Sequence, residues 1–268
     1  MNFEEKYIKY KIKYIKYKTQ VNENTYDKIT KTIIKYNNND IIVYDDSYLI
    51  GGTKTRLLNL LLPKLKEKEI IYAGPSTGLA QVALAFVSKK YNKRATVFLS
   101  SYDKNNSQLV DLAIKHGAKI IYPKIQSLKY VRKIAEKYAL KKKYRYLLPF
   151  GLKSDDNLKL FKTALNIVLQ NEKQPKRLWL VAGSGFLLEV LHSIWPDTKY
   201  MIVQVGKKIW PDQLENINNE LFIAPENFTE NASSQPPYNT IPWYDAKLWQ
   251  FFEKYGKKND CIWNVGGL

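Results

Sequence analysis

The chain has 268 residues, 45% of them hydrophobic and 13% aromatic, which allows one large core or two modest ones and excludes a short peptide. Its 43 lysines and arginines outnumber its 25 acidic residues, and the net charge of +18 favours phosphate-rich or other anionic partners. Because Cys261 is the single cysteine and only two histidines are present, an intramolecular disulfide and a Cys/His zinc cluster are excluded, and we expect no metal site.

The hydropathy pattern excludes a membrane-spanning class of protein. No apolar run approaches the roughly 20 residues that a transmembrane helix needs. The first residues also lack the apolar core of a signal peptide. We therefore expect a cytoplasmic protein without a transmembrane segment.

Residues 6–18 repeat Lys-Tyr-Ile-Lys-Tyr-Lys with a period of seven. In a helix the tyrosines and isoleucines would share one face and the lysines the other, so the pattern predicts a basic amphipathic helix. It has three open roles: packing on its own domain or on a dimer mate, binding nucleic acid, or binding a membrane surface. Residues 19–39 indicate a polar linker with one short helix around Lys28 to Lys35, and the folded domain is expected to begin near Asp40.

The segment from Asp45 to Arg56 is the first that suggests chemistry. A β-branched and aromatic strand at 41–44 ends at two aspartates, and Gly51-Gly52-Thr53-Lys54 leads into an apolar helix that stops at Pro63. Thr53 is the expected N-cap, which puts Lys54 in the first turn, where the helix dipole and apolar surroundings lower a lysine pKa. A Schiff-base lysine needs that setting, and the two glycines would leave room for a flat ligand. A lone lysine at a helix start is, however, usually a solvated surface residue.

Strands and helices then alternate, which predicts an open parallel sheet. The expected strands are 69–73, 95–99, 119–122 and 145–149, and the expected helices are 79–87, 107–116 and 128–140. The turn Gly74-Pro75-Ser76-Thr77-Gly78 opens the first of these helices, so its backbone N–H groups and hydroxyls could bind a carboxylate or a phosphate. His116 directly precedes Gly117, which indicates a helix C-cap rather than a catalyst.

The second half repeats this arrangement. The expected elements are helix 156–170, strand 177–181, a helix ending at 192, strand 200–205, a surface loop at 226–243 that could border the site, helix 246–255 and strand 261–265. Gly183, Ser184 and Gly185 lie between a hydrophobic strand and a helix, where main-chain N–H groups can hold a phosphate. A simple tight turn is the alternative interpretation.

Taken together, the segments from Asp45 to the C-terminus resemble the fold type II pyridoxal-phosphate enzymes, the tryptophan synthase β-subunit family. The resemblance is greatest to the branch with aminocyclopropane-carboxylate deaminase and D-cysteine desulfhydrase. Four landmarks occur in the family's order: the Gly-Gly-Thr-Lys-Thr-Arg segment at 51–56, the turn at 74–78, the turn at 183–185 and Asn-Val-Gly-Gly at 264–267.

This resemblance implies an α/β fold of two open, mostly parallel sheets with flanking helices. A larger domain (40–72 and 149–268) would carry a smaller inserted one (73–148), preceded by the leader and linker (1–39). Lys54 would bind pyridoxal phosphate as a Schiff base and act as the base on a small amino acid, in deamination, elimination or replacement. The implied contacts are Gly183, Ser184, Gly185 and Asn264 for the cofactor, and Ser76, Thr77 and Gly78 for the substrate. Relatives also imply a homodimer.

The chain departs from the family at several cofactor positions. Ser76 and Thr77 replace an asparagine, Phe186 and Leu187 replace a glycine and a threonine, and Val265 replaces a threonine. These changes leave open an alternative, a catalytically inactive homologue that acts as a basic scaffold for nucleic acid or another polyanion. The Lys-Tyr-Ile leader is similar to leaders of large-DNA-virus proteins, and a viral member would act in the host cytoplasm or the virion.

Overall fold

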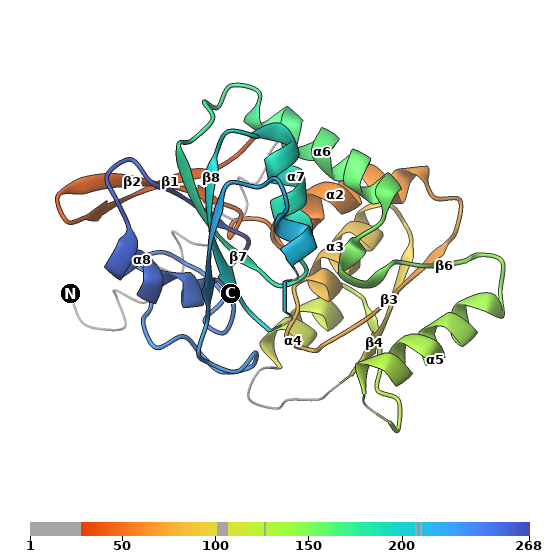
Figure 1. Cartoon of the computed structure of the whole chain (residues 1–268). Helices are drawn as coiled ribbons and strands as arrows, with labels where there is room; N and C mark the ends of the chain where they lie inside the picture. The colour runs from red at the N-terminus through yellow and green to blue at the C-terminus, as the bar shows by residue number, and fades with distance from the viewer. Residues whose placement is uncertain (1–27, 101–106, 126, 207, 210) are drawn as a thin grey trace, which may run out of the picture.

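The computed structural model describes residues 28–100, 107–125, 127–206, 208–209 and 211–268, which form two sheets flanked by helices (Figure 1). The amphipathic leader at 6–18 lies outside these residues. Within them, no helix combines the length and the apolar character needed to cross a membrane.

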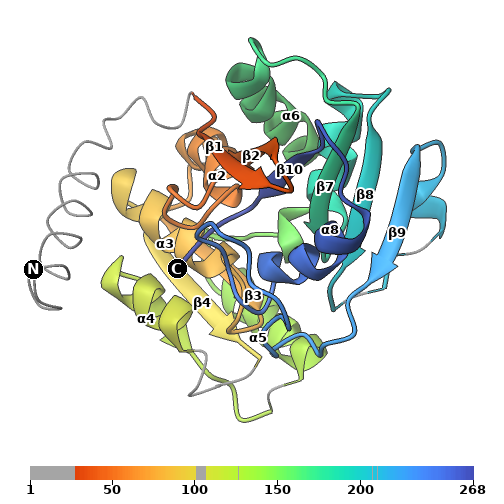
Figure 2. The same ribbon diagram turned by 90° about the vertical axis from the view of Figure 1, so that its left-hand side faces the viewer.

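The larger sheet has six strands in the spatial order β1, β2, β10, β7, β8, β9, which fan out across Figure 2. The strands are β1 (Lys31–Tyr36), β2 (Asn39–Asp45), β7 (Arg177–Ala182), β8 (Lys199–Gln204), β9 (Asn219–Ile223) and β10 (Cys261–Asn264). The β1 strand is antiparallel to β2, and every other pairing in the sheet is parallel.

The smaller sheet has four parallel strands in the order β5, β4, β3, β6. Its strands are β3 (Glu69–Gly74), β4 (Arg94–Leu99), β5 (Lys119–Ile121) and β6 (Arg145–Leu147). Two open, mostly parallel sheets are therefore confirmed.

Helices cover both faces of each sheet, because a parallel strand is apolar on both sides. The helices are α2 (Lys54–Leu61), α3 (Ala80–Lys90), α4 (Gln108–Lys115), α5 (Leu128–Leu140), α6 (Asp155–Leu169), α7 (Phe186–Ile194) and α8 (Trp249–Tyr255), with short 3₁₀ turns η2 (Leu62–Lys64), η4 (Phe150–Leu152), η5 (Pro211–Leu214) and η6 (Asp245–Leu248). The largest core joins both sheets through α2, α3, α6 and α7. Separate clusters lie under α8 on the larger sheet and under α5 on the smaller one.

Two expectations about the N-terminal part of the fold are wrong. The short helix expected around Lys28 to Lys35 is instead strand β1, so the folded region begins before Asp40. The turn between β1 and β2 is made by Asn37 and Asn38, whose φ angles of 47° and 60° suit a type I′ hairpin. The expected strand at 69–73 is β3, which pairs with β4 and β6 in the smaller sheet. Strand β9 was not expected at all. The division into two domains stays a prediction.

The segment before α2 is fixed on the end of β10. The N–H of Asp46 donates to the carbonyl of Asn264 (3.0 Å), and the N–H of Thr53 donates to the carbonyl of Val265 (2.8 Å). The carboxylate of Asp46 forms a buried ion pair with Arg56, with 2.6 Å between Oδ1 and Nη2. These contacts hold both ends of the 46–56 segment, so the start of α2 has one position.

The glycines of this segment allow protein, not ligand, to approach closely. A Cβ at Gly52 would lie 2.0 Å from the carbonyl oxygen of Val265, and one at Gly51 would lie 2.3 Å from the Cα of Ala83. The expected room for a flat ligand is therefore absent on the Cβ side of both glycines, where helix α3 (at Gly51) and the end of β10 (at Gly52) fill the space.

We predict that Gly52→Ala destabilises the protein more than Gly117→Ala. Both glycines have a positive φ, +67° and +88°, but a Cβ at Gly117 would meet nothing within 4 Å. The control, Gly117→Ala, should lose roughly 1–2 kcal/mol of unfolding free energy from backbone strain alone. Gly52→Ala should lose about 1–3 kcal/mol more, because its Cβ clashes with Val265. Urea denaturation of both variants measures the difference. Equal losses would mean that Val265 moves aside without cost.

Candidate active site

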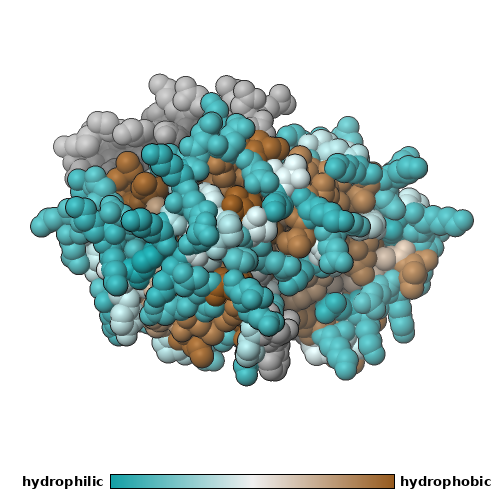
Figure 3. Space-filling view, turned by 45° about the horizontal axis from the view of Figure 1, so that its top comes forward, coloured by the Kyte–Doolittle hydropathy of each residue, from teal (hydrophilic) through white to brown (hydrophobic). Residues whose placement is uncertain are grey.

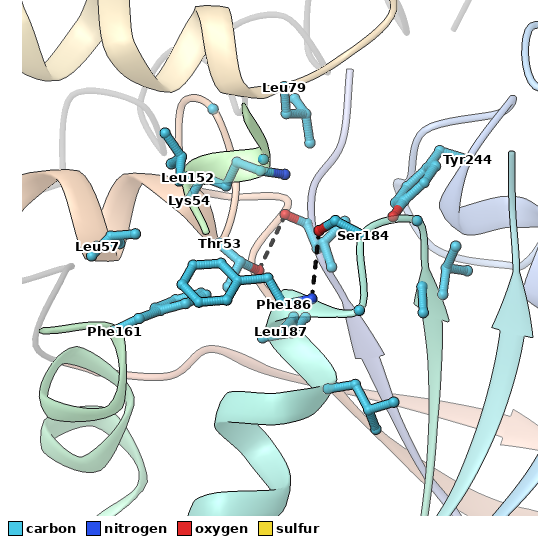
Figure 4. A pocket seen from close by; sticks show the side chains of 18 residues that line it. Thr53, Lys54, Leu57, Leu79, Leu152, Phe161, Ser184, Phe186, Leu187 and Tyr244 are labelled. Atoms are coloured by element: carbon cyan, nitrogen blue, oxygen red, sulfur yellow. Dashed lines mark hydrogen bonds between the residues drawn. The ribbon is translucent and has the colours of Figure 1, made fainter. Parts of the chain in front are cut away.

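A pocket lies between the two sheets, where α2, α7 and the end of β10 meet (Figure 4). It is lined by Gly51, Thr53, Lys54, Leu57, Leu79, Gly151, Leu152, Phe161, Val181, Ala182, Gly183, Ser184, Gly185, Phe186, Leu187, Leu188, Tyr244 and Val265. The structure thus brings Lys54 together with the 183–185 turn, although 128 residues or more separate them in the chain.

Lys54 is the first residue of α2, and its side chain points into the pocket between Leu79 and the turn that carries Ser184 (Figure 4). Loss of hydration among apolar side chains lowers the pKa of its amine, while the carboxylate of Asp245 acts in the opposite direction. Among the described residues, Lys54 Nζ has no hydrogen-bond partner. The amine is therefore free to react with something that enters the pocket.

Thr53 does not cap α2 with its side chain, contrary to expectation. Its hydroxyl donates to the carbonyl of Val265 (3.4 Å) and accepts from the indole of Trp263 (3.1 Å). The hydroxyl is thus used to hold α2 against β10, a contact between residues far apart in the sequence. Lys54 still occupies the first turn.

The turn after β7 supplies backbone N–H groups at the start of α7. Gly185 takes a left-handed conformation (φ 75°), which directs the chain into the helix. Ser184 Oγ accepts from the N–H of Phe186 (3.4 Å), and the hydroxyl of Tyr244 lies beside Gly183, where a Cβ on that glycine would stand 3.0 Å from it. The first N–H groups of a helix have no partner within it and attract anions, so this end of the pocket suits a phosphate or a carboxylate.

Apolar side chains make up most of the remaining wall. The rings of Phe161 and Phe186 lie 5.4 Å apart, and both are almost fully buried. Leu152 is buried as well, with a positive φ of 65° that is rare outside glycine. The pocket and its open mouth leave about 570 Å³ free of protein, but the cavity inside measures only about 50 Å³. A ligand larger than a few water molecules must also occupy the mouth.

The structure adds Tyr244, which lines the pocket, and Asp245, which is not among the lining residues but whose charge acts on Lys54; the sequence analysis missed both. Asp245 Oδ1 accepts from the N–H of Val265 (3.4 Å), and its Oδ2 is buried without a partner among the described residues. Burial raises the pKa of the Asp245 carboxyl, although the charge of Lys54 opposes that shift. The one sequence signal was the polar surface loop at 226–243, which was interpreted as able to border the site and which ends directly before Tyr244.

Ser76, Thr77 and Gly78 lie beside the pocket and not in its lining. The carbonyl of Thr77 accepts from the indole of Trp243 (3.1 Å), whereas its hydroxyl is buried without a partner among the described residues. The segment leads directly to Leu79, which does line the pocket. It is therefore close to the Lys54 site, on the side of the smaller sheet.

Asn264 is also outside the lining, and its amide is already bonded to protein. The amide nitrogen donates to Asp45 Oδ1 and to the carbonyl of Asn239, both at 2.8 Å, and the amide oxygen accepts from Thr240 (3.0 Å). Its side chain thus links β10 to β2 and to the 239–240 segment. Val265, the next residue, faces the pocket instead.

No family profile matches this sequence, and no curated protein matches it by sequence. Solved structures do match. An ACC deaminase homologue has a TM-score of 0.69 and 17% identity over 90% of this chain and 89% of its own. Diaminopropionate ammonia lyase from Escherichia coli has a TM-score of 0.64 and 11% identity, over 94% of this chain and 87% of its own. A hydrogen sulfide-producing enzyme from Fusobacterium nucleatum has a TM-score of 0.64 and 14% identity, over 92% of this chain and 98% of its own.

These likenesses confirm the fold that was expected from the resemblance to fold type II pyridoxal-phosphate enzymes. At such low identity they show the fold alone. The particular branch of that family stays a prediction.

We predict that Lys54 is acylated at lower pH than an ordinary lysine. Its amine has a lowered pKa in the folded chain, so the reactive neutral form appears at a pH below the usual value of about 10.4. Competitive labelling with acetic anhydride, followed by mass spectrometry of the Lys54 peptide at each pH, gives that pKa. The control is the chain unfolded in urea, where the pKa should return to the ordinary value. A folded-state value equal to the control would contradict the prediction.

Proposed function

We propose that this chain is a pyridoxal-phosphate-dependent enzyme that acts on a small amino acid by deamination, elimination or replacement. One observation carries the proposal. A lysine amine without a partner and a helix N-terminus with a Gly-Ser-Gly turn line the same pocket, from segments far apart in the sequence. An aldehyde that carries a phosphate needs those two features together.

The chemistry of the available groups fits pyridoxal phosphate. Lys54 would hold its aldehyde carbon, and Gly183, Ser184 and Gly185 would hold its phosphate at the start of α7. Asp245 lies outside the lining, and its charge acts on the Lys54 amine. When bound, pyridoxal phosphate supplies an electron sink for the bonds at the amino acid's α-carbon.

The chain's own residues would then position the substrate and move the proton. The neutral amine of Lys54 can take the proton from the substrate α-carbon, because its pKa is lowered toward the working range of a general base. Leu79, Phe161 and Phe186 keep water from that amine. We further propose that the 76–78 segment binds the substrate carboxylate, since the Thr77 hydroxyl beside the pocket lacks a partner among the described residues.

A catalytically inactive homologue is the second candidate, and the pocket wall favours it. Phe186 is 4% exposed and fills space at the start of α7, and Val265 presents no side-chain hydrogen-bond donor. The cavity of about 50 Å³ is small for a cofactor. The two candidates differ in one measurable respect, the covalent binding of pyridoxal phosphate at Lys54.

We predict that the purified chain takes up pyridoxal phosphate and absorbs visible light. Borohydride should fix one cofactor per chain, on the peptide that carries Lys54. The variant Lys54→Ala should lose the absorption and the fixed cofactor, because Lys54 is the only amine among the described residues that line the pocket. Absorption spectra and peptide mass spectrometry make both measurements.

The matched control is Lys159→Ala, which removes an exposed lysine from α6. It should bind cofactor like the unmodified chain. Labelling spread evenly over surface lysines, or no uptake of added pyridoxal phosphate, would remove the enzyme proposal and leave the inactive homologue.

A further inference from the structure

Four loops meet at one edge of the smaller sheet, away from the pocket. They cover residues 62–69, 88–94, 115–119 and 141–145, and each leads into the amino end of a strand. Because the four strands are parallel, these amino ends lie at the same edge. Hydrogen bonds join the loops: the N–H of Lys68 donates to the carbonyl of Tyr144 (3.0 Å), and the N–H of Arg94 donates to the carbonyl of Lys68 (2.8 Å). We call this surface the basic edge.

The positive charge of the chain is concentrated at the basic edge. Its 25 residues carry thirteen lysines and arginines and two acidic residues, a net +11 of the chain's +18. An even spread of +18 over 268 residues would give 25 residues about +2. Residues 1–27, which include the lysine-rich leader, contribute only +2. A lysine-rich composition alone does not explain this distribution.

Most of these cations face solvent. The exposed members are Lys64, Lys66, Lys68, Lys89, Lys90, Arg94, Lys115, Lys119, Lys141, Lys142 and Lys143. Lys64, Lys66, Lys68 and the lysines at 141–143 form no ion pair within the part of the chain that the structure describes. In Figure 3, long hydrophilic side chains project from the right-hand end, where the smaller sheet lies.

A buried carboxylate holds two arginines of the basic edge in place. Glu69, 4% exposed, binds Arg145 (Nε to Oε2, 2.9 Å) and Arg94 (Nη2 to Oε2, 3.5 Å). The guanidinium carbons of these arginines lie 5.4 Å (Arg94) and 5.7 Å (Arg145) from the ring centre of Tyr144. Tyr144 as a residue is 40% exposed. An exposed aromatic ring close to two guanidinium groups can stack on a nucleotide base, with the cations near the phosphates.

We propose that the basic edge binds single-stranded nucleic acid, with the lysines on phosphates and Tyr144 under a base. Alternating cationic and aromatic contacts are how proteins hold single strands without reading their sequence. The pocket with Lys54 lies beyond the carboxyl end of β3, past Gly78, whereas the basic edge lies at the amino end. The two sites therefore do not overlap, and this proposal does not depend on the proposed enzyme activity.

The test measures the fluorescence anisotropy of a labelled 20-nucleotide single strand with the full-length protein, at several salt concentrations. Reversal of Lys141, Lys142 and Lys143 to Glu should weaken binding at least about tenfold, through lost phosphate contacts and new repulsion. The slope of log affinity against log salt should fall by about 2, since each phosphate contact on a single strand contributes about 0.7. Tyr144→Ala should weaken binding by roughly tenfold through lost stacking and leave the salt slope unchanged.

The matched control reverses Lys254, Lys257 and Lys258, three exposed lysines in and after α8. It changes the net charge equally, and its affinity should stay within about threefold of the unmodified chain. Lys54→Ala should also bind normally, which separates this proposal from the enzyme proposal. Equal losses in both charge-reversed variants, no binding at low salt, or binding only to phosphatidylserine vesicles would each overturn it.

Discussion

The docking of the 46–56 segment on the end of β10 is the constraint on which the rest of the site depends. The Asp46–Arg56 ion pair is buried, so loss of either partner would leave an uncompensated charge in the core. The contact of Gly52 with the carbonyl of Val265 leaves no space for a side chain. Together these contacts determine where α2 begins, and so where Lys54 projects.

The same constraint produces the electrostatics of the pocket. Because α2 and β10 pack so closely, Lys54 and Asp245 share an environment with little water, and each charge moves the pKa of the other group. Burial favours the neutral form of both groups, whereas their mutual attraction favours the charged forms. A protein gains little stability from such a pair. An amine with a lowered pKa, in the same low-water environment as a carboxyl oxygen without a partner among the described residues, is useful when something binds between the sheets.

Sequence patterns predicted the elements with strong local signals and missed those that depend on distant contacts. The parallel strands and the glycine turns were predictable, because β-branched runs and Gly/Ser turns act within a few residues. Asn37 and Asn38 were interpreted as a linker, although a pair of asparagines also suits a type I′ turn, so β1 was missed. Asp245 was missed because its burial depends on β10 and α2, which no local pattern near it shows. Asn264 was expected at the cofactor, but its amide is bonded within the protein.

The wall of the pocket belongs to the main core of the protein, which limits how the pocket can change. Phe161 and Phe186 contact each other and lie in the cluster that joins the two sheets. Replacement of a buried phenylalanine by a small residue typically costs about 3–5 kcal/mol, a large part of the stability of a domain. Phe186 is therefore a packing position in this chain. Any ligand of this site must use the mouth of the pocket, where the 183–185 turn, Tyr244 and the amine of Lys54 are within reach.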